Sequence, residues 1–280
     1  MDNVTLIRAL RGDGSLDALL LPITNLGSEF GYIALLTVVY LLAPSIGRQI
    51  GLWFGVNVAL NTLLKFAFNL PRPYFLDSSI GTLAAHLTAA GPGLPSGHAQ
   101  NAAFVWGYIA LRLQRTWVWV LAVVVTLLIS FSRLYLGVHF LEDVILGLVL
   151  GASLAFLASR VTVFKLNALT ALGLLIALGG VCAMLGEDYG RVFGLLWAFL
   201  CASADFKPPA NLGARFAFAI GGLVLVFALY FASSALLPEE VKRSGIGSLL
   251  RYALLTLAVV ELYPRLALGG WSRKPSVATA

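Results

Sequence analysis

Runs of about 20 mostly apolar residues recur along the whole chain, and a helix needs about that many to cross the ~30 Å hydrocarbon core of a bilayer. Only 11% of the 280 residues are charged, whereas a soluble domain carries about 25%. The strands of a membrane barrel would alternate polar and apolar residues, and these runs do not. The sequence therefore predicts an all-α fold, a polytopic bundle of transmembrane helices.

Proline, glycine and charged residues divide the chain into nine expected spans. They cover residues 27–43, 50–68, 96–111, 117–131, 139–159, 164–185, 189–204, 213–237 and 249–268. The seventh span is short and contains Arg191, so a bundle of eight crossings is the alternative. Residues 1–26 mix charges with leucines, as amphipathic helices at a membrane interface do. We therefore expect an interfacial segment at 1–26, a transmembrane core at 27–185 and additional C-terminal transmembrane helices at 186–280.

The basic residues between the spans indicate how the bundle is oriented. The loops after spans one, three and five contain no acid and five basic residues, Arg48, Arg112, Arg115, Arg160 and Lys165. The positive-inside rule places this end of the bundle in the cytoplasm. The opposite, outer end then holds the loop of residues 69–95 and the hinge of residues 132–138. Because the basic residues are scattered and form no stripe, we expect no nucleic-acid partner.

Three polar islands interrupt the apolar pattern at the outer end. They are Lys65–Pro73, Pro95–His98 and Ser132–Asp143. An ionisable side chain at the centre of a membrane helix costs roughly 2.5–3.5 kcal/mol on insertion scales, so such residues usually mark a functional site. Asn57 and Asn61 precede Lys65 at intervals of four residues, which places all three side chains on one helical face. We expect that face to point into the bundle.

The third island contains a histidine with an acid one helical turn away. Asp143 follows His139 by four residues, and Glu142, at three residues, is the competing partner. A carboxylate on one imidazole nitrogen fixes the tautomer and leaves the other nitrogen free. A histidine held in this way can act as a nucleophile. We favour Asp143 over Glu142 on spacing.

The second island has the features of an anion site at the start of a helix. Ser96 is expected to cap the helix, and Gly97 allows close approach to the backbone. The free amides of a helix N-terminus attract anions. His98 would then lie beside the bound anion, where it could protonate a leaving oxygen.

Three cationic side chains, Lys65, Arg72 and Arg133, complete the pattern. Arginine matches phosphate oxygens with a planar fork, and lysine acts as a compact point charge. Three cations suit a phosphoryl transition state, whose charge is spread over several oxygens. We therefore interpret the three islands as one phosphate site. We assign no metal site, and we expect no cofactor.

The spacing of these residues resembles the signature of the type 2 phosphatidic acid phosphatase (PAP2) superfamily. The matching positions are Lys65, Arg72-Pro73, Pro95-Ser96-Gly97-His98, Ser132-Arg133, His139 and Asp143. The resemblance covers residues 28–160. It implies that His139 is a nucleophile that forms a phosphohistidine, with Asp143 as its partner and His98 as the general acid. It also implies that the phosphate binders are Lys65, Arg72, Ser96, Gly97 and Arg133, and that no metal takes part.

The resemblance further implies a membrane phosphatase that hydrolyses a lipid phosphate or diphosphate. Candidate substrates are polyprenyl diphosphate, phosphatidate, phosphatidylglycerol phosphate and a sphingoid-base phosphate. One alternative is a phosphotransferase that passes the phosphoryl group to a lipid or glycan. Another is a sugar phosphatase similar to glucose-6-phosphatase. The expected location is the bacterial inner membrane, among membrane lipids, with the site on the periplasmic face.

Overall fold

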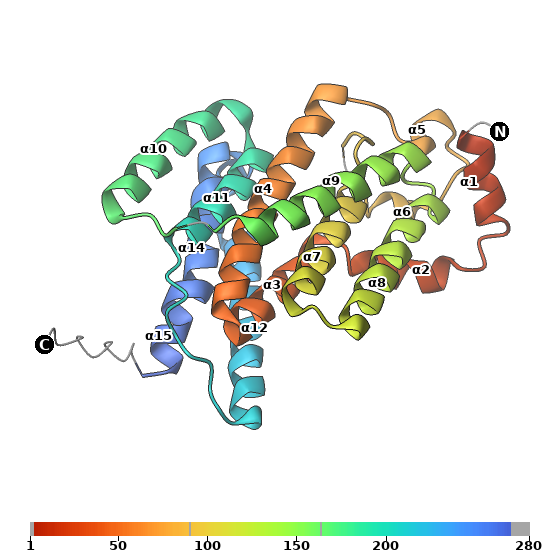
Figure 1. Ribbon diagram of the computed structural model, residues 1–280. Coiled ribbons are helices and arrows are strands. Elements are labelled where there is room, and N and C mark those ends of the chain that lie inside the picture. The colour runs from red at the N-terminus through yellow and green to blue at the C-terminus, as the bar shows by residue number, and fades with distance from the viewer. Residues whose placement is uncertain (1–2, 90, 163, 270–280) are drawn as a thin grey trace, which may run out of the picture.

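The computed structural model describes residues 3–89, 91–162 and 164–269, and the regular elements in these residues are all helices (Figure 1). The first eight are α1 (Asn3–Arg11), α2 (Asp17–Asn25), α3 (Glu29–Leu42), α4 (Pro44–Phe68), α5 (Pro73–Leu76), α6 (Leu83–His86), α7 (Gly97–Leu113) and α8 (Thr116–Tyr135). Then follow α9 (Leu141–Arg160), α10 (Ala168–Leu185), α11 (Glu187–Cys201), α12 (Leu212–Leu236), α13 (Glu239–Arg243), α14 (Gly245–Leu257), the π-helical turn η1 (Ala258–Leu262) and α15 (Tyr263–Ala267). The prediction of an all-α helix bundle is confirmed.

Each of the nine expected spans contains a helix. Within the described residues, six helices are long and apolar enough to cross a membrane. The count rises to seven if α2 and α3, bent by 47° at a short break, form one span. Three of the expected spans are shorter helices, because α3 has 14 residues, α7 has 17 and α11 has 15. The number of crossings, nine or eight, stays a prediction.

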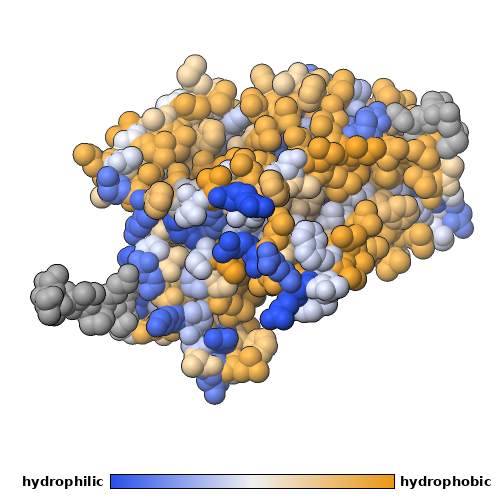
Figure 2. Space-filling model, in the orientation of Figure 1, coloured by the Kyte–Doolittle hydropathy of each residue, from blue (hydrophilic) through white to orange (hydrophobic). Residues whose placement is uncertain are grey.

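The surface of the bundle suits a membrane. Figure 2 shows a largely apolar surface over α8 and α9, where large side chains such as Trp117, Leu127 and Val149 are exposed. Hydrophilic side chains gather near the α7–α8 loop and the end of α9 (Figure 2). Arg112, in the last turn of α7, and Arg160, in the last turn of α9, are exposed. The protein is therefore an integral membrane protein with an apolar girdle.

The segments with the three polar islands meet at one end of the bundle. In Figure 1 the end of α4, the short helices α5 and α6, and the α8–α9 connection lie toward the upper right. The α3–α4 turn and the α7–α8 loop lie at the lower side of the same view (Figure 1). The loop of residues 69–95 is less irregular than its prolines and glycines suggested, because it contains α5 and α6. Pro73 begins α5, where the absent N–H costs nothing, and Thr82 caps α6.

Two N-terminal helices close the bundle on one side. In α1 and α2, Ile7 and Leu20 are buried, and the backbone amide of Leu16 donates to the Tyr135 hydroxyl at 2.9 Å. Thr24, near the end of α2, is fully buried. The N-terminal segment therefore packs on α8 and places a hydroxyl inside the bundle.

Two glycines bring α9 very close to α7. A Cβ atom added at Gly147 would overlap the carbonyl oxygen of Ser96, and one added at Gly151 would overlap that of Gln100. Small residues at this spacing allow such an approach between membrane helices. The packing fixes the start of α7 against the first turns of α9.

Gly151→Val should therefore destabilise the protein, because the new side chain has the α7 backbone in its way. Overpacking of this kind costs about 1–3 kcal/mol. A thermal unfolding scan in detergent should show a melting temperature lower by roughly 2–10 °C. Gly173→Val in α10 is the matched control, since an added Cβ there meets no atom within 4 Å. Equal melting temperatures for the two variants would contradict the tight α7–α9 fit.

Candidate active site

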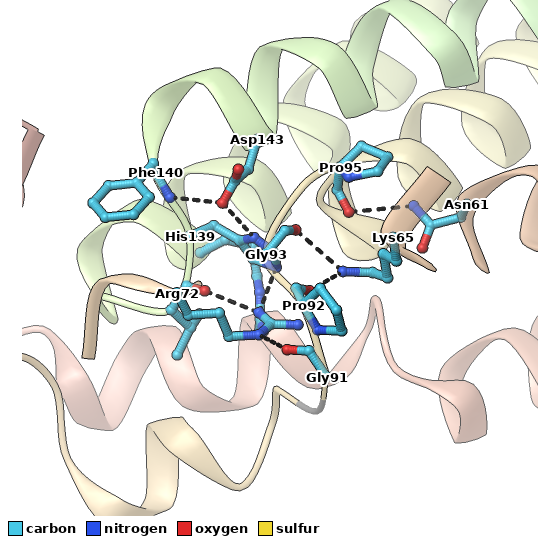
Figure 3. Close-up of polar contacts among 12 residues, drawn as sticks. Asn61, Lys65, Arg72, Gly91, Pro92, Gly93, Pro95, His139, Phe140 and Asp143 are labelled. Atoms are coloured by element: carbon cyan, nitrogen blue, oxygen red, sulfur yellow. Dashed lines mark hydrogen bonds and ion pairs between the residues drawn. The ribbon is translucent and has the colours of Figure 1, made fainter. Parts of the chain in front are cut away.

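His139 lies in the short connection between α8 and α9 and is 1% exposed. Its Nδ1 is 3.0 Å from Asp143 Oδ2, and the same oxygen accepts the backbone N–H of Phe140 at 3.0 Å (Figure 3). Asp143 is in the first turn of α9, where a carboxylate accepts the amide of the residue before the helix. Glu142 is exposed. Of the two candidate carboxylates, Asp143 therefore contacts the imidazole.

Arg72 contacts the other side of the same imidazole. Its Nη1 donates to the Val138 carbonyl at 2.9 Å and lies 2.8 Å from His139 Nε2, while its Nε donates to the Gly91 carbonyl at 2.7 Å (Figure 3). Because the Asp143 carboxylate can only accept, we assign the proton to Nδ1, which leaves a lone pair on Nε2. Arg72 then donates to the nitrogen that is expected to attack.

The surroundings of His139 favour its neutral form. Burial, reinforced by the charges of Arg72, Arg133 and Lys65, holds the pKa of His139 well below its ordinary value. The imidazole therefore stays neutral at pH values where an exposed histidine would already be protonated. A neutral imidazole is the form that can attack phosphorus.

Lys65 holds the loop that passes beneath His139. Its ammonium group donates to the carbonyl oxygens of Pro92 and Gly93, the latter at 3.1 Å (Figure 3). Gly93 lies against the Asp143 carboxylate, because a Cβ added there would be 3.0 Å from Asp143 Oδ2. Any larger residue at position 93 would press on Asp143, and the sequence carried no local signal for this contact.

The polar stripe on α4 points into the bundle, as predicted. Asn57 is 0% and Asn61 7% exposed. Asn61 donates to the Pro95 carbonyl at 3.3 Å and to Gln100 Oε1 at 2.8 Å (Figure 3 shows the first contact), and Asn57 donates to Asn101 at 2.6 Å. We missed Gln100 and Asn101 in the sequence. Their polarity inside an apolar span was the signal that could have found them.

Ser96 sits at the N-cap position of α7, but its side chain makes no capping bond. Its backbone N–H donates to the Asp143 carbonyl at 2.9 Å, which ties the start of α7 to α9. Its hydroxyl is buried and has no hydrogen-bond partner within the described residues. The prediction that this hydroxyl caps the helix is therefore wrong, and the hydroxyl remains available to a ligand. Gly97 faces Asn61, from whose Oδ1 an added Cβ would be 3.2 Å away.

His98 follows in the first turn of α7 and is half-buried. Its ring lies against Gly27, just before α3, because a Cβ added at Gly27 would be 2.9 Å from His98 Cδ2. His98 also lines a cavity of about 780 Å³, together with Lys65 and Gly97. The side chain is therefore placed beside open space rather than in the packed core.

Arg133 is fully buried, and its contacts run to two threonines rather than to His139. Its Nη1 donates to Thr24 Oγ1 at 2.6 Å and to Thr88 Oγ1 at 3.0 Å, and its Nη2 donates to the Thr88 carbonyl at 3.1 Å. Its Nε is buried and lacks a hydrogen-bond partner in the part of the chain that the structure describes. Sequence reasoning missed both threonines, since nothing in their local sequence distinguishes them.

The eight residues selected from sequence thus divide into groups. Arg72, His139 and Asp143 form one chain of contacts, Lys65 joins them through Gly93, and Ser96 joins through its backbone. Gly97 and His98 meet Lys65 at the cavity. Arg133 approaches from the side of α2 and the 69–95 loop. The arrangement can hold an anion beside a neutral imidazole, and the catalytic and binding roles of these residues stay predictions.

Comparison with known proteins identifies the family. Residues 46–166 match the model of the PAP2 superfamily, and residues 187–269 match that of the PAP2 superfamily phosphatase, transmembrane extension. The chain is 28% identical over 150 residues to an undecaprenyl-diphosphatase of Sulfolobus acidocaldarius, covering 52% of this chain and 71% of that protein. It is 36% identical over 113 residues to phosphatidylglycerophosphatase B of Bacillus subtilis, covering 37% and 52%.

Among solved structures, the chain resembles the crystal structure of the first transmembrane PAP2 type phosphatidylglycerolphosphate phosphatase from Bacillus subtilis. The identity is 29%, the TM-score is 0.49, and the match covers 56% of this chain and 83% of that one. The two family matches follow one another along the sequence and leave outside its first 45 residues, its last 11 residues and residues 167–186, which contain α10. The chain belongs to the PAP2 superfamily and is a membrane phosphatase of that family.

Proposed function

We propose that the chain hydrolyses a lipid phosphate or diphosphate through a phosphohistidine at His139. The observation that carries the proposal is the pair of contacts on this imidazole, with Asp143 on Nδ1 and a guanidinium at Nε2. The names of the two relatives indicate undecaprenyl diphosphate and phosphatidylglycerophosphate as their substrates. Phosphatidate and a sphingoid-base phosphate belong to the same chemical class. The site is proposed to open at the periplasmic face of a bacterial inner membrane.

In the first step, the Nε2 lone pair of His139 attacks phosphorus. The bond between phosphorus and the ester or bridging oxygen breaks, and its electron pair goes to that oxygen, which takes a proton from His98. Asp143 stabilises the positive charge that develops on the imidazole. Arg72 must release Nε2 during this step, and its N–H group can turn to a phosphoryl oxygen.

In the second step, a water molecule attacks the phosphohistidine. Neutral His98 takes a proton from the water, the bond between phosphorus and Nε2 breaks, and inorganic phosphate leaves. The imidazole recovers its lone pair, and His98 is again protonated. The cycle consumes one water molecule and needs no change of oxidation state.

Buried donors around the imidazole support an anionic ligand. Arg133 Nε and the Ser96 hydroxyl are both buried without a hydrogen-bond partner among the described residues. An unsatisfied buried donor costs about 1–3 kcal/mol. A phosphoryl group has enough acceptor oxygens to satisfy both, together with Lys65 and Arg72. We therefore propose these four residues and the backbone at Gly97 as the phosphate binders.

A panel of substrates tests the proposal. Purified protein in detergent should release inorganic phosphate from at least one of phosphatidate, phosphatidylglycerol phosphate, sphingosine phosphate and undecaprenyl diphosphate. It should release none from glucose 6-phosphate. Acid quenching of the reaction with ³²P-labelled substrate should not preserve a label, whereas alkaline quenching should, as expected of a phosphohistidine. Release from glucose 6-phosphate alone, or transfer of the label to a lipid acceptor instead of water, would contradict the proposal.

His98→Ala should slow the reaction most for substrates with poor leaving groups. General acid catalysis contributes about 10²–10⁴-fold, and an activated ester needs little of it. We expect a loss of that size for an alkyl phosphate and a much smaller loss for p-nitrophenyl phosphate. Comparing kcat/KM for the two esters measures the difference. An equal loss for both would argue against the acid role.

A further inference from the structure

A long cavity separates the catalytic core from the C-terminal helices. It has a volume of about 780 Å³, within the range of about 300–1,000 Å³ that is typical of ligand sites. One wall comes from α3 and α4 of the core, and the other from α11, α12 and α14. Figure 1 shows α11 and α14 beside α4. Representative lining residues are Leu36, Val58, Leu195, Val226 and Leu255.

The cavity is polar at one end and apolar at the other. Lys65 and His98 line the end at the phosphate site. Along α3 the lining runs from Glu29 to Tyr40, and along the antiparallel α4 it runs from Lys65 back to Phe54. Each of these stretches rises by roughly 16 Å at 1.5 Å per residue. That depth is about half of the ~30 Å hydrocarbon thickness, or one leaflet.

The C-terminal helices follow the same gradient. In α11, Glu187 and Arg191 lie at the polar end and form an ion pair at 2.8 Å, while Phe199 lies farther along the helix. In α14, the hydroxyl of Tyr252 donates to Glu29 of α3 at 2.6 Å. This bond joins the C-terminal helices to the core at the polar end of the cavity. All charged residues that line the cavity are at this end, and the rest of the lining is mostly apolar.

We propose that this cavity holds the apolar chain of the substrate, and that α11, α12 and α14 form the wall that selects the chain. The inference rests on the proposed function. Its support is continuity, since the same cavity is lined by Lys65, Gly97 and His98. A phosphate ester bound there has its charged group beside Lys65 and His98 and its chain in an apolar channel one leaflet deep. The substrate class is therefore a phosphate ester with a long apolar chain, bound inside the protein rather than left in the membrane lipid.

Two tryptophan substitutions on α12 test the proposal. Val226 lines the cavity and is 8% exposed, whereas Val224, two residues earlier, is 64% exposed and is absent from the lining. The readout is the ratio of kcat/KM for hexadecyl phosphate to that for butyl phosphate in detergent. Val226→Trp should lower this ratio at least about 10-fold, as blocked space in an apolar pocket does. Val224→Trp should leave the ratio as in the unmodified protein.

The outcomes separate the inference from the proposed function. An unmodified protein that releases phosphate from neither ester nor from any lipid phosphate would overturn the proposed function. A protein that prefers hexadecyl phosphate and keeps this preference in Val226→Trp would overturn only the inference. A fall of the ratio in both tryptophan variants would also overturn it, because the effect would not come from the cavity.

A labelling experiment covers the case in which Val226→Trp does not fold. Thr256 of α14 lines the cavity, so Thr256→Cys, made together with Cys182→Ala and Cys201→Ala, puts a single thiol there. Hexadecyl phosphonate, which is not hydrolysed, should slow reaction of this thiol with N-ethylmaleimide about 10-fold at ten times its Kd. Butyl phosphonate should not. Val224→Cys in the same background is the control. Equal labelling rates with and without hexadecyl phosphonate would overturn the inference.

Discussion

His139→Ala should abolish phosphate release, with a loss of kcat on the order of 10⁴–10⁶-fold, as for the loss of a nucleophile in other enzymes. Alanine removes the atom that would attack phosphorus, together with the imidazole that Asp143 contacts at Nδ1 and Arg72 contacts at Nε2. The measurement is phosphate release in detergent, together with alkaline trapping of the ³²P label, which should be absent. A thermal scan establishes that the variant is folded.

His86→Ala is the matched control for this variant. His86 stacks on Tyr74 with ring centroids 4.2 Å apart, and its Nε2 lies 2.8 Å from the Ile80 carbonyl, so its contacts run within the 69–95 loop. We expect activity within a few-fold of the unmodified protein. If His139→Ala retained label or more than a hundredth of the activity, which is a difference of less than about 2.7 kcal/mol in barrier height, the phosphohistidine mechanism would be refuted.

Asp143→Asn should lower kcat by about 10³–10⁴-fold, although the side chain keeps its shape. In serine proteases, the equivalent substitution of the triad aspartate costs about 10⁴-fold. Here the Phe140 N–H and His139 Nδ1 both contact Asp143 Oδ2, so an asparagine oxygen in that position can accept from both. The variant then lacks the negative charge that stabilises the imidazole as it becomes positive.

Without that charge, the imidazole becomes positive beside the Arg72 guanidinium with no carboxylate on Nδ1 to offset it. The fold should survive, so the melting temperature of the variant should stay close to that of the unmodified protein. Glu142→Gln is the control, because it neutralises a neighbouring exposed carboxylate. We expect it to stay within about twofold, since surface charges contribute little. A similar loss in both variants would show that any nearby negative charge suffices, and that the contact of Asp143 with Nδ1 has no special role.

The features that sequence could predict are those with a local pattern. Hydropathy located every long helix, because crossing a bilayer fixes both length and composition. Spacing selected Asp143 over Glu142, and the contact is present, although His139 lies before α9 and not on its face. The four-residue interval of Asn57 and Asn61, which do share a helical face, placed both in the interior. The position of Ser96 at the start of α7 was also predicted correctly, because serine is a preferred residue immediately before a helix.

The features that sequence could not predict depend on contacts between distant segments. Thr24 and Thr88 reach Arg133 from 109 and 45 residues away, and an isolated threonine gives no hint of such a partner. Gly93 supports Asp143 through shape alone. The bond from the Ser96 N–H to the Asp143 carbonyl joins α7 to α9, which no local pattern reveals. The cavity arises only when the C-terminal helices pack against the core.

The close fit of α7 against α9 has a consequence for how a bulky lipid gains access to the site. Gly147 and Gly151 leave no slack between the two helices, and the bond from Ser96 to Asp143 locks their outer ends together. His98, in the first turn of α7, and His139, just before α9, are therefore held in a fixed position relative to each other. If the cavity widens to admit an apolar chain, we expect α3 or the C-terminal helices to move, since they form its other walls, and we expect the distance between the two histidines to stay the same.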